Sequence, residues 1–401
     1  RHCWQHLLRS MSSDQTVVEY RAMMRAAYGS RYRPEDVYAA TLLADLDALN
    51  CGVTAIADMA HIMNSPEHAD AALAAHRESG IRVRFMHGVP NDASAAEWWS
   101  ASARPHPHDI RRLRDQLRDD EARVSLGMFA RPPFLVTEDV LRHDMRLAGE
   151  LGLHVTIDGG LGGGCWSSKR WGDEGMRPVA ALAEIGELDE HVTLVHGNNL
   201  PDSEWRLLGD SGAHLSISPE HEMLCGHGLP ATKNALRHGI QPGLSIDSVI
   251  AVSSDMFGTM RAALTATRGA WADDAYARGT SVDTWQLTTA DVLRFATQHS
   301  AQACGYGDSV GAIRPGARAD LVLLRPDPLN LSLRGDPVSV VVTNAHPGNV
   351  DTVIVDGEVR KAGGVLAFPV ERALGLAEAA REHVVATAPP SLVDADWARF
   401  S

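Results

Sequence analysis

Short apolar runs rich in β-branched residues recur along the first three quarters of the chain, separated by stretches whose apolar residues repeat with helical spacing. Apolar runs of about four to eight residues, bounded by turn signals, are typical of buried strands. The regular alternation of strands with helices predicts parallel βαβ units. The predicted strands span residues 53–58, 82–87, 124–129, 154–158, 192–196, 214–218 and 243–247.

The number of strands decides between two α/β architectures. We expect one further strand just before Arg1, which makes eight strands over roughly 250 residues, the size of a (β/α)8 TIM-like barrel. A doubly wound open sheet is the alternative, but no glycine-rich phosphate turn follows the run at 53–58. The glycines at 159–164 do follow a strand, yet they lack a clean G-x-G-x-x-G start to a helix. The pattern therefore favours the barrel.

The pattern changes after residue 305. Segments 311–324 and 350–364 combine strands with turns, and Asp356-Gly357 is a hairpin signal. A helix rich in alanine and glutamate follows over 370–386. We therefore predict a catalytic barrel with a truncated first strand over 1–305, an accessory β domain over 306–368 and a C-terminal helical extension over 369–401.

Composition narrows the possible partners. Apolar residues make up 44% and charged residues 22% of the 401 residues, as in a globular chain able to bury a large core. No apolar run approaches the roughly 18–20 residues that span a bilayer, so we expect no membrane association. The net charge of −14 disfavours nucleic acid as a partner. Five scattered cysteines without a CxxC pair predict a cytoplasmic protein with reduced thiols.

Titratable residues end or follow nearly every predicted strand, and the site of a (β/α)8 barrel lies at those ends. Histidines and carboxylates that meet at one mouth are what a divalent metal needs, and a metal lowers the pKa of bound water to around 7. One such histidine or aspartate alone is more often structural, so the prediction rests on their coincidence. These residues are His2, Asp58, His61, His87, Arg131, Asp158, His196, Glu220, His221 and Asp247.

Several motifs spaced along nearly the whole chain point to one family. They are residues 1–5 (RHCWQ), 194–200 (LVHGNNL), 216–220 (SISPE), 226–228 (GHG) and 239–247 (GIQPGLSID), together with 311–322 and 350–357. Together they resemble the amidohydrolase superfamily, specifically its cytosine-deaminase and chlorohydrolase-like branch. The resemblance implies a hydrolase, expected to be a homodimer, that uses metal-activated water on a small-molecule substrate. The bond cleaved would be C–N, or a related carbon–heteroatom bond, in a cyclic or nitrogen-rich metabolite.

The resemblance also implies roles for single residues. His2 is similar to the second histidine of the first-strand pair, His196 to the sixth-strand ligand, and Asp247 to the eighth-strand aspartate that touches metal and shuttles protons. One divalent metal, zinc or iron, would be held by these three residues. The candidate catalytic residues are Asp247, His196, Asp158, Glu220 and His221. The candidate substrate-binding residues are His61, His87, Trp4, Gln5 and Trp166.

Two departures from the family pattern leave the metal open. Asp158 stands where the family has a fifth-strand histidine, and Leu161 stands where a proton-donating glutamate would follow. In one outcome the metal persists with Asp158 as a replacement ligand, because a carboxylate can substitute for imidazole. In the other the metal is absent, and Asp158, His196 and Asp247 form an acid/base site for a lyase, isomerase or cyclase. A non-catalytic binding protein is a further alternative.

Overall fold

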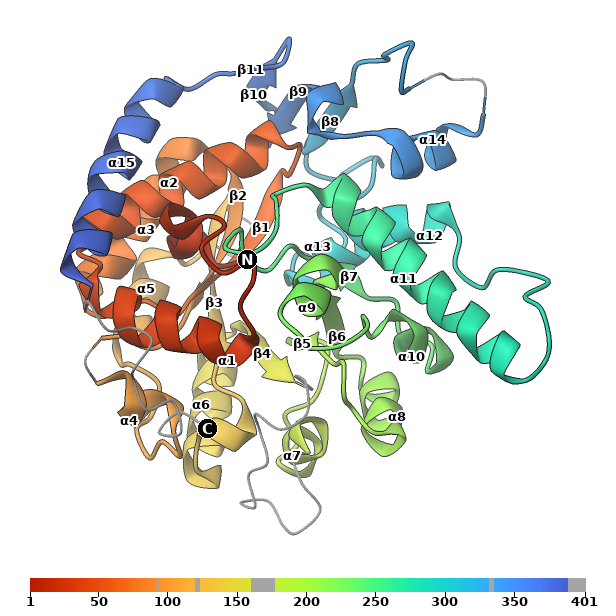
Figure 1. Cartoon of the computed structure of the whole chain (residues 1–401). Coiled ribbons are helices and arrows are strands. Elements are labelled where there is room, and N and C mark those ends of the chain that lie inside the picture. Colours follow the sequence, from red (N-terminus) through yellow and green to blue (C-terminus); the bar gives the residue numbers. More distant parts are fainter. Residues whose placement is uncertain (93, 120–122, 160–176, 332–334, 389–401) are drawn as a thin grey trace.

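The computed structural model describes residues 1–92, 94–119, 123–159, 177–331 and 335–388. Seven parallel strands form one curled sheet in sequence order, with helices outside it (Figure 1). This arrangement confirms the predicted (β/α)8-type fold. The strands are β1 (Ala55–Ala60), β2 (Arg82–His87), β3 (Val124–Ala130), β4 (His154–Gly159), β5 (Val192–His196), β6 (His214–Ile217) and β7 (Gly243–Leu244).

Helices follow the strands in the order that the sequence pattern predicts. In α6 (Glu138–Leu151), the Thr137 hydroxyl caps the start by accepting from the Val140 amide, and Gly152 ends the helix in a left-handed conformation. The longer helices are α2 (Pro34–Asn50), α3 (Pro66–Ser79), α5 (Asp109–Gln116), α8 (Asp202–Ser211) and α11 (Met256–Ala277). The shorter ones are η1 (Cys3–Leu8), α1 (Val17–Tyr20), η2 (Arg21–Tyr28), η3 (Gly29–Arg31), α4 (Ala95–Trp99), η4 (Pro133–Leu135), α7 (Pro178–Glu184), α9 (Pro219–Leu224), α10 (Thr232–Arg237), α12 (Thr289–Arg294), η6 (Phe295–His299) and α13 (Ser300–Ala303).

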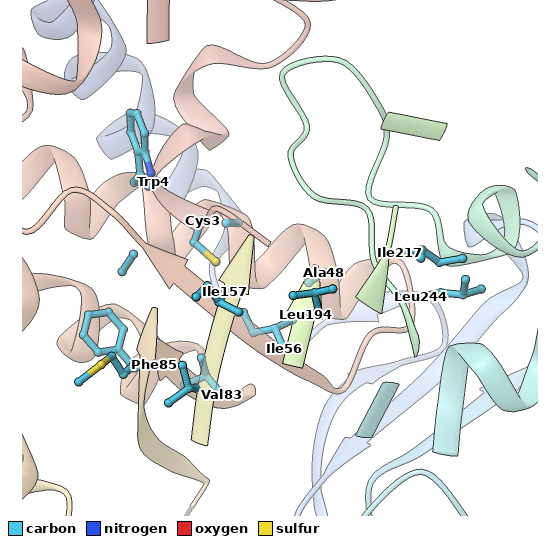
Figure 2. Packing of buried hydrophobic residues seen from close by; sticks show 14 of the residues in the cluster. Cys3, Trp4, Ala48, Ile56, Val83, Phe85, Ile157, Leu194, Ile217 and Leu244 are labelled. Carbon is cyan, nitrogen blue, oxygen red and sulfur yellow. The ribbon is translucent and has the colours of Figure 1, made fainter. Parts of the chain in front are cut away.

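The core lies between the sheet and its helices. All residues of β2 and β3 are buried. This explains the nearly continuous apolar sequence of β3, whereas β2 also buries Arg82 and Arg84. Figure 2 shows Ile56, Val83, Phe85, Ile157 and Leu194 packed from neighbouring strands. The parallel register aligns the strand ends, so polar residues that follow different strands meet at one mouth.

Arg1 and His2 lie between the two edges of the sheet. The amino group of Arg1 donates to the Ala57 carbonyl at 2.7 Å, and the Arg1 carbonyl accepts from the Met59 amide at 2.8 Å. On the other side, the His2 amide donates to the Asp247 carbonyl at 3.0 Å. This is the position expected for the end of a first strand. A cavity of about 550 Å³ beside these edges is lined by residues that include Cys51, Leu244 and Asp247, together with Asp320 and Leu321.

A second, antiparallel sheet lies beside the first (Figure 1). Asp356 and Gly357 both have positive φ, at 53° and 82°, which confirms the predicted hairpin. The division into domains at residues 305 and 368 stays a prediction. The elements here are β8 (Leu321–Leu324), α14 (Pro337–Asn344), η7 (Pro347–Asn349), β9 (Val350–Val355), β10 (Glu358–Ala362), β11 (Val365–Leu366) and α15 (Val370–Thr387), which packs against α2 through Ala373.

A buried ion pair joins the two sheets. The Arg82 guanidinium at the start of β2 donates to both carboxylate oxygens of Asp320, at 2.7 and 3.0 Å, and both side chains are 2% exposed. Asp356 in the hairpin turn provides a second contact at 3.0 Å. Within the described residues, no helix has the length and apolarity that crossing a membrane would require.

Removing the Asp320 charge should destabilise the protein. We expect Asp320→Asn to lower the free energy of unfolding by about 3 kcal/mol, because Arg82 then stays buried with an incomplete set of partners. Urea unfolding measures this change. Asp115→Asn, in an exposed pair with Arg118, is the control and should cost no more than ~0.5 kcal/mol. Equal losses in the two variants would contradict the role given to the ion pair.

Candidate active site

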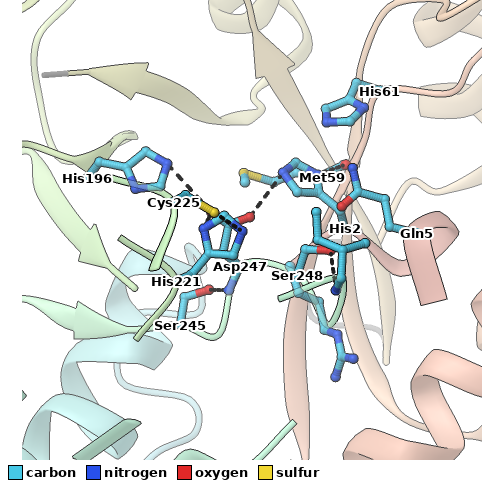
Figure 3. A network of polar contacts seen from close by, with 12 residues as sticks. His2, Gln5, Met59, His61, His196, His221, Cys225, Ser245, Asp247 and Ser248 are labelled. Carbon is cyan, nitrogen blue, oxygen red and sulfur yellow. Dashed lines mark hydrogen bonds and ion pairs between the residues drawn. The ribbon is translucent and has the colours of Figure 1, made fainter. Parts of the chain in front are cut away.

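Asp247 lies among three imidazole rings at the mouth of the sheet (Figure 3). One carboxylate oxygen is 3.4 Å from Nε2 of His2. The other is 3.1 Å from Nδ1 of His221 and 3.8 Å from Nε2 of His196. The angle at His221 departs from that of a hydrogen bond, so this contact is an ion pair. All four side chains are buried, although they come from distant parts of the chain.

The backbone is strained at two of these positions. His196 ends β5 with φ of 77°, and Asp247 follows β7 with φ of 60°, in the left-handed region that non-glycine residues rarely adopt. The Asp247 amide is held by the Ser245 hydroxyl at 3.0 Å. After His196, the Gly197 amide donates to the Gly159 carbonyl at 2.7 Å. Strain of this kind gathers at functional sites, where the surrounding structure holds it in place.

The outer nitrogens of two rings fix which nitrogen faces Asp247. Nδ1 of His2 lies 2.8 Å from the Met59 carbonyl, and Nδ1 of His196 lies 3.1 Å from a carboxylate oxygen of Glu222. A carbonyl or carboxylate only accepts, so both Nδ1 atoms carry the proton. In the neutral rings, each Nε2 therefore presents its lone pair toward Asp247. Two imidazole lone pairs thus face one carboxylate.

Burial and the neighbouring charges shift the pKa values of these groups in opposite directions. Burial alone would raise the pKa of Asp247, but His221, His2 and His196 hold it well below its ordinary value. Burial lowers the pKa of His2, and the attraction of Asp247 only partly offsets that effect. At His196 burial lowers the pKa, but the contact with Glu222 and the charges of Glu222, Asp247 and Asp158 together raise it. The carboxylate is therefore ionised, and its imidazole neighbours stabilise it.

The spacing of His2 and Asp247 is that of two donors to a single divalent cation. Two donors bound to one tetrahedral zinc ion lie roughly 3.4 Å apart, given bonds of about 2.1 Å. The separation between His2 and Asp247 matches this value, and that between His196 and Asp247 is slightly wider. Among the described residues, no three His, Cys, Asp or Glu side chains already lie close enough together to hold a metal ion. The fit therefore rests on the facing lone pairs, which repel one another unless a cation or proton lies between them.

Glu222 is a site residue that the sequence reasoning missed. Its side chain is fully buried and accepts from the Ser218 amide at 2.8 Å and from the Asn198 amide group at 3.2 Å, besides its contact with His196. Carboxylates that hold the outer nitrogen of a ligand histidine orient the ring and raise its basicity. Its place in the first turn of the helix after the predicted strand 214–218 was the available signal.

His2 is anchored from behind by a buried charge network. The Cys3 amide donates to a carboxylate oxygen of Asp58 at 3.0 Å. The other oxygen of Asp58 is 3.1 Å from His76, whose second nitrogen is 2.8 Å from Asp45. Asp58 was expected at the mouth, but its contacts are with η1 and α3. It therefore positions the segment that carries His2, because alternate residues of β1 face opposite sides of the sheet.

His61, Trp4 and Gln5 lie next to His2. The His61 ring centre is 4.2 Å from that of His2, and the Trp4 indole donates to Nδ1 of His61 at 3.2 Å. Trp4 is 1% exposed and packs edge-on against Tyr32. Its placement supports positioning of His61 rather than stacking on a substrate. The Gln5 amide group donates to the Tyr20 hydroxyl at 2.7 Å, so its buried carbonyl oxygen has a fixed direction.

An apolar wall adjoins the rings of His2 and His61. Phe129 lies 6.3 Å from His2 and 5.8 Å from His61 between ring centres, and Trp99 lies 5.8 Å from His61. The wall comprises Met59, Met86, Val89, Ala95, Trp99, Phe129, Phe134, Leu135 and Val195.

Three other residues expected at the site, His87, Glu220 and Arg131, have their partners outside the group around Asp247. His87 pairs with His106 at 3.0 Å, and burial lowers its pKa to about 4, so the ring is neutral. Glu220 accepts from Thr259 at the start of α11, and the structure gives no contact between the described Glu220 and Asp247. Arg131 pairs with Asp144 at 3.0 Å behind the sheet.

The fifth predicted strand ends close to the imidazoles. Asp158 pairs in register with Val195, one residue before His196. Burial lowers the pKa of His2 and of His196, and the charge of Asp158 is one of those that oppose this effect at both residues. Asp158 is 8% exposed. Trp166 and Leu161 lie outside the described residues. Asp158 therefore stays a candidate fourth ligand or acid/base group.

Comparisons with known proteins find relatives that match most of the chain. The model of the amidohydrolase family matches residues 5–360. A 5-methylthioadenosine/S-adenosylhomocysteine deaminase of Acetivibrio thermocellus is 25% identical, covering 89% of this chain and 78% of its own. A 5′-deoxyadenosine deaminase of Methanothermobacter thermautotrophicus is 28% identical, covering 88% and 77%.

Solved structures share the fold. An adenosine deaminase of Xanthomonas campestris with bound zinc has a TM-score of 0.79 at 22% identity, covering 96% of this chain and 84% of its own. The zinc complex of atrazine chlorohydrolase from Arthrobacter aurescens TC1 has a TM-score of 0.80 at 19% identity, covering 95% and 86%.

Replacing Glu222 should weaken the capture of a metal ion. We expect Glu222→Gln to bind zinc about 10–100-fold less tightly, because His196 loses the carboxylate that holds its outer nitrogen. Competition with a chromophoric chelator measures the affinity. Glu204→Gln is a matched control, since Glu204 is also fully buried but accepts from the amides of Val179 and Ala180. Unchanged affinity in Glu222→Gln would refute the assignment.

Proposed function

The chain belongs to the amidohydrolase family, and on this premise we propose that it hydrolyses a small cyclic or nitrogen-rich metabolite. The bond cleaved is C–N or a related carbon–heteroatom bond. The observation that carries the proposal is that Nε2 of His2 and Nε2 of His196 both face the carboxylate of Asp247, at 3.4 and 3.8 Å. That arrangement suits a hydrolytic centre built around one cation.

His2, His196 and Asp247 are the proposed metal-holding residues. When bound there, a divalent cation supplies Lewis-acid activation of water near neutral pH. Asp247 enters each turnover ionised, because its imidazole neighbours lower its pKa, so its oxygens are free to take a proton and return it. His221 orients the carboxylate through the 3.1 Å contact.

The aromatic surroundings of the donors favour a substrate with a flat ring. Phe129, Trp99 and His61 are buried aromatic neighbours around His2, and Gln5 has a carbonyl oxygen that can accept from a substrate N–H group. The names of the relatives, which include adenosine derivatives and a chlorinated triazine, fit this class of molecule. They also favour hydrolysis over the lyase, isomerase or cyclase alternative and over a non-catalytic binding protein.

We further propose the metal, the cellular location and the oligomeric state of the protein. We propose zinc or iron(II) as the metal, since solved structures with this fold contain zinc. A cytoplasmic location is consistent with the free thiols of Cys3, Cys51, Cys225 and Cys304. A homodimer is proposed from the family resemblance alone.

Turnover should depend on Asp247. We expect the zinc-loaded chain to release ammonia or chloride from at least one of adenosine, 5′-deoxyadenosine, 5′-methylthioadenosine and atrazine. Asp247→Asn should lower that rate about 10²–10⁴-fold, because the proton-accepting carboxylate is lost. Asp274→Asn, at a surface pair with Lys233, is the control. Wild-type rates in Asp247→Asn, or no release from any compound by loaded enzyme, would reject the proposal.

Asp158 should respond to replacement by the histidine that the family pattern expects. If it is a replacement ligand, Asp158→His should bind zinc at least about tenfold more tightly, since imidazole is the better zinc donor at neutral pH. Asp158→Asn should bind more weakly than wild type. Equilibrium competition with a chelator distinguishes the three proteins. Equal affinities would remove Asp158 from the ligand set.

A further inference from the structure

The three imidazoles around Asp247 differ in what holds their outer nitrogens. The outer nitrogen of His2 meets the Met59 carbonyl, and that of His196 meets the Glu222 carboxylate. The outer nitrogen of His221, which is Nε2, lies 3.5 Å from Sγ of Cys225. The first two partners only accept hydrogen bonds, whereas a thiol can donate or accept.

This difference gives His221 another role. His2 and His196 turn lone pairs toward Asp247, as ligands of a cation do. His221 turns Nδ1 toward the same carboxylate at 3.1 Å, and a carboxylate can only accept, so Nδ1 carries the proton. A thiol at Nε2 is compatible with that proton whether the ring is neutral or charged.

The local fold keeps the thiol against the ring. His221 and Cys225 are four residues apart, one helical turn, and the Cys225 amide donates to the His221 carbonyl at 2.9 Å. The Cys225 carbonyl accepts from the Val17 amide at 3.1 Å, which ties the end of α9 to α1. Both side chains are at most 3% exposed, and the Tyr20 ring packs edge-on against His221. The ring therefore has little freedom to turn.

We propose that Cys225 is a positioning residue, which holds the ring of His221 so that its Nδ1–H faces Asp247. His221 then acts as the proton-bearing partner of an ion pair with the carboxylate and not as a third imidazole ligand. The inference rests on the proposed function for its effect on turnover, but the ring geometry it describes is independent of any substrate. Figure 3 shows His221 between Cys225 and Asp247, in contact with each of them.

The test compares Cys225→Ala with Cys225→Ser in the full-length chain. Long-range ¹H–¹⁵N spectra of the metal-free, ¹⁵N-histidine-labelled protein report which ring nitrogen carries the proton, and His221→Gln identifies the signals. We expect Cys225→Ala to shift the His221 signals and to lower kcat at least about tenfold with KM nearly unchanged. Cys225→Ser should retain the wild-type signals and rate, because a hydroxyl also donates and accepts.

Controls separate this effect from loss of packing. Cys51→Ala removes another buried thiol and should change neither the His221 signals nor kcat. If Cys225→Ala fails to fold, Cys225→Val fills the space without a polar atom and takes its place. Wild-type signals and kcat in the variant without the thiol would overturn the proposal, as would equal losses in Cys225→Ser. If wild type turns over no substrate, the proposed function fails, while the spectra still decide the inference.

Discussion

The structure around the site depends on one buried anion. The carboxylate of Asp247 is almost removed from water, which would cost several kcal/mol if it stood alone. Three imidazoles within 3.8 Å offset this cost and keep the group ionised. The left-handed backbone at Asp247 and His196 is the conformational cost of aiming both side chains at one point.

The barrel brings these groups together, and the helices behind it hold them in orientation. His2 depends on β1 for its outer nitrogen and on the network of Asp58 and His76 for its backbone. Helix α9 orients the opposite side, because Glu222 meets His196 and His221 meets Asp247. The short helix α9 thus orients His196, which ends β5, and Asp247, which follows β7. The start of α9 is itself stabilised, because Glu222 accepts from the Ser218 amide.

The strands could be predicted from the sequence because both faces of a parallel sheet are buried, which leaves a continuous apolar run. The hairpin at Asp356-Gly357 was predictable because few sequences tolerate two successive left-handed residues. The direction in which side chains point was harder to predict from the sequence. Asp58 ends an apolar run as Asp158 does, yet it faces the helices, since register decides which alternate residues enter the barrel. Glu222 was missed because its contact with His196 depends on how α9 is turned, which tertiary packing sets.

The central claim is that His2, His196 and Asp247 form the donor set of a single cation. X-ray absorption at the zinc edge, on the chain loaded with one equivalent of zinc, tests it most directly. The account predicts tight binding of one ion in a shell of nitrogen and oxygen with two imidazoles and no sulfur. Sulfur in that shell, fewer than two imidazoles, or the absence of stoichiometric binding would contradict it.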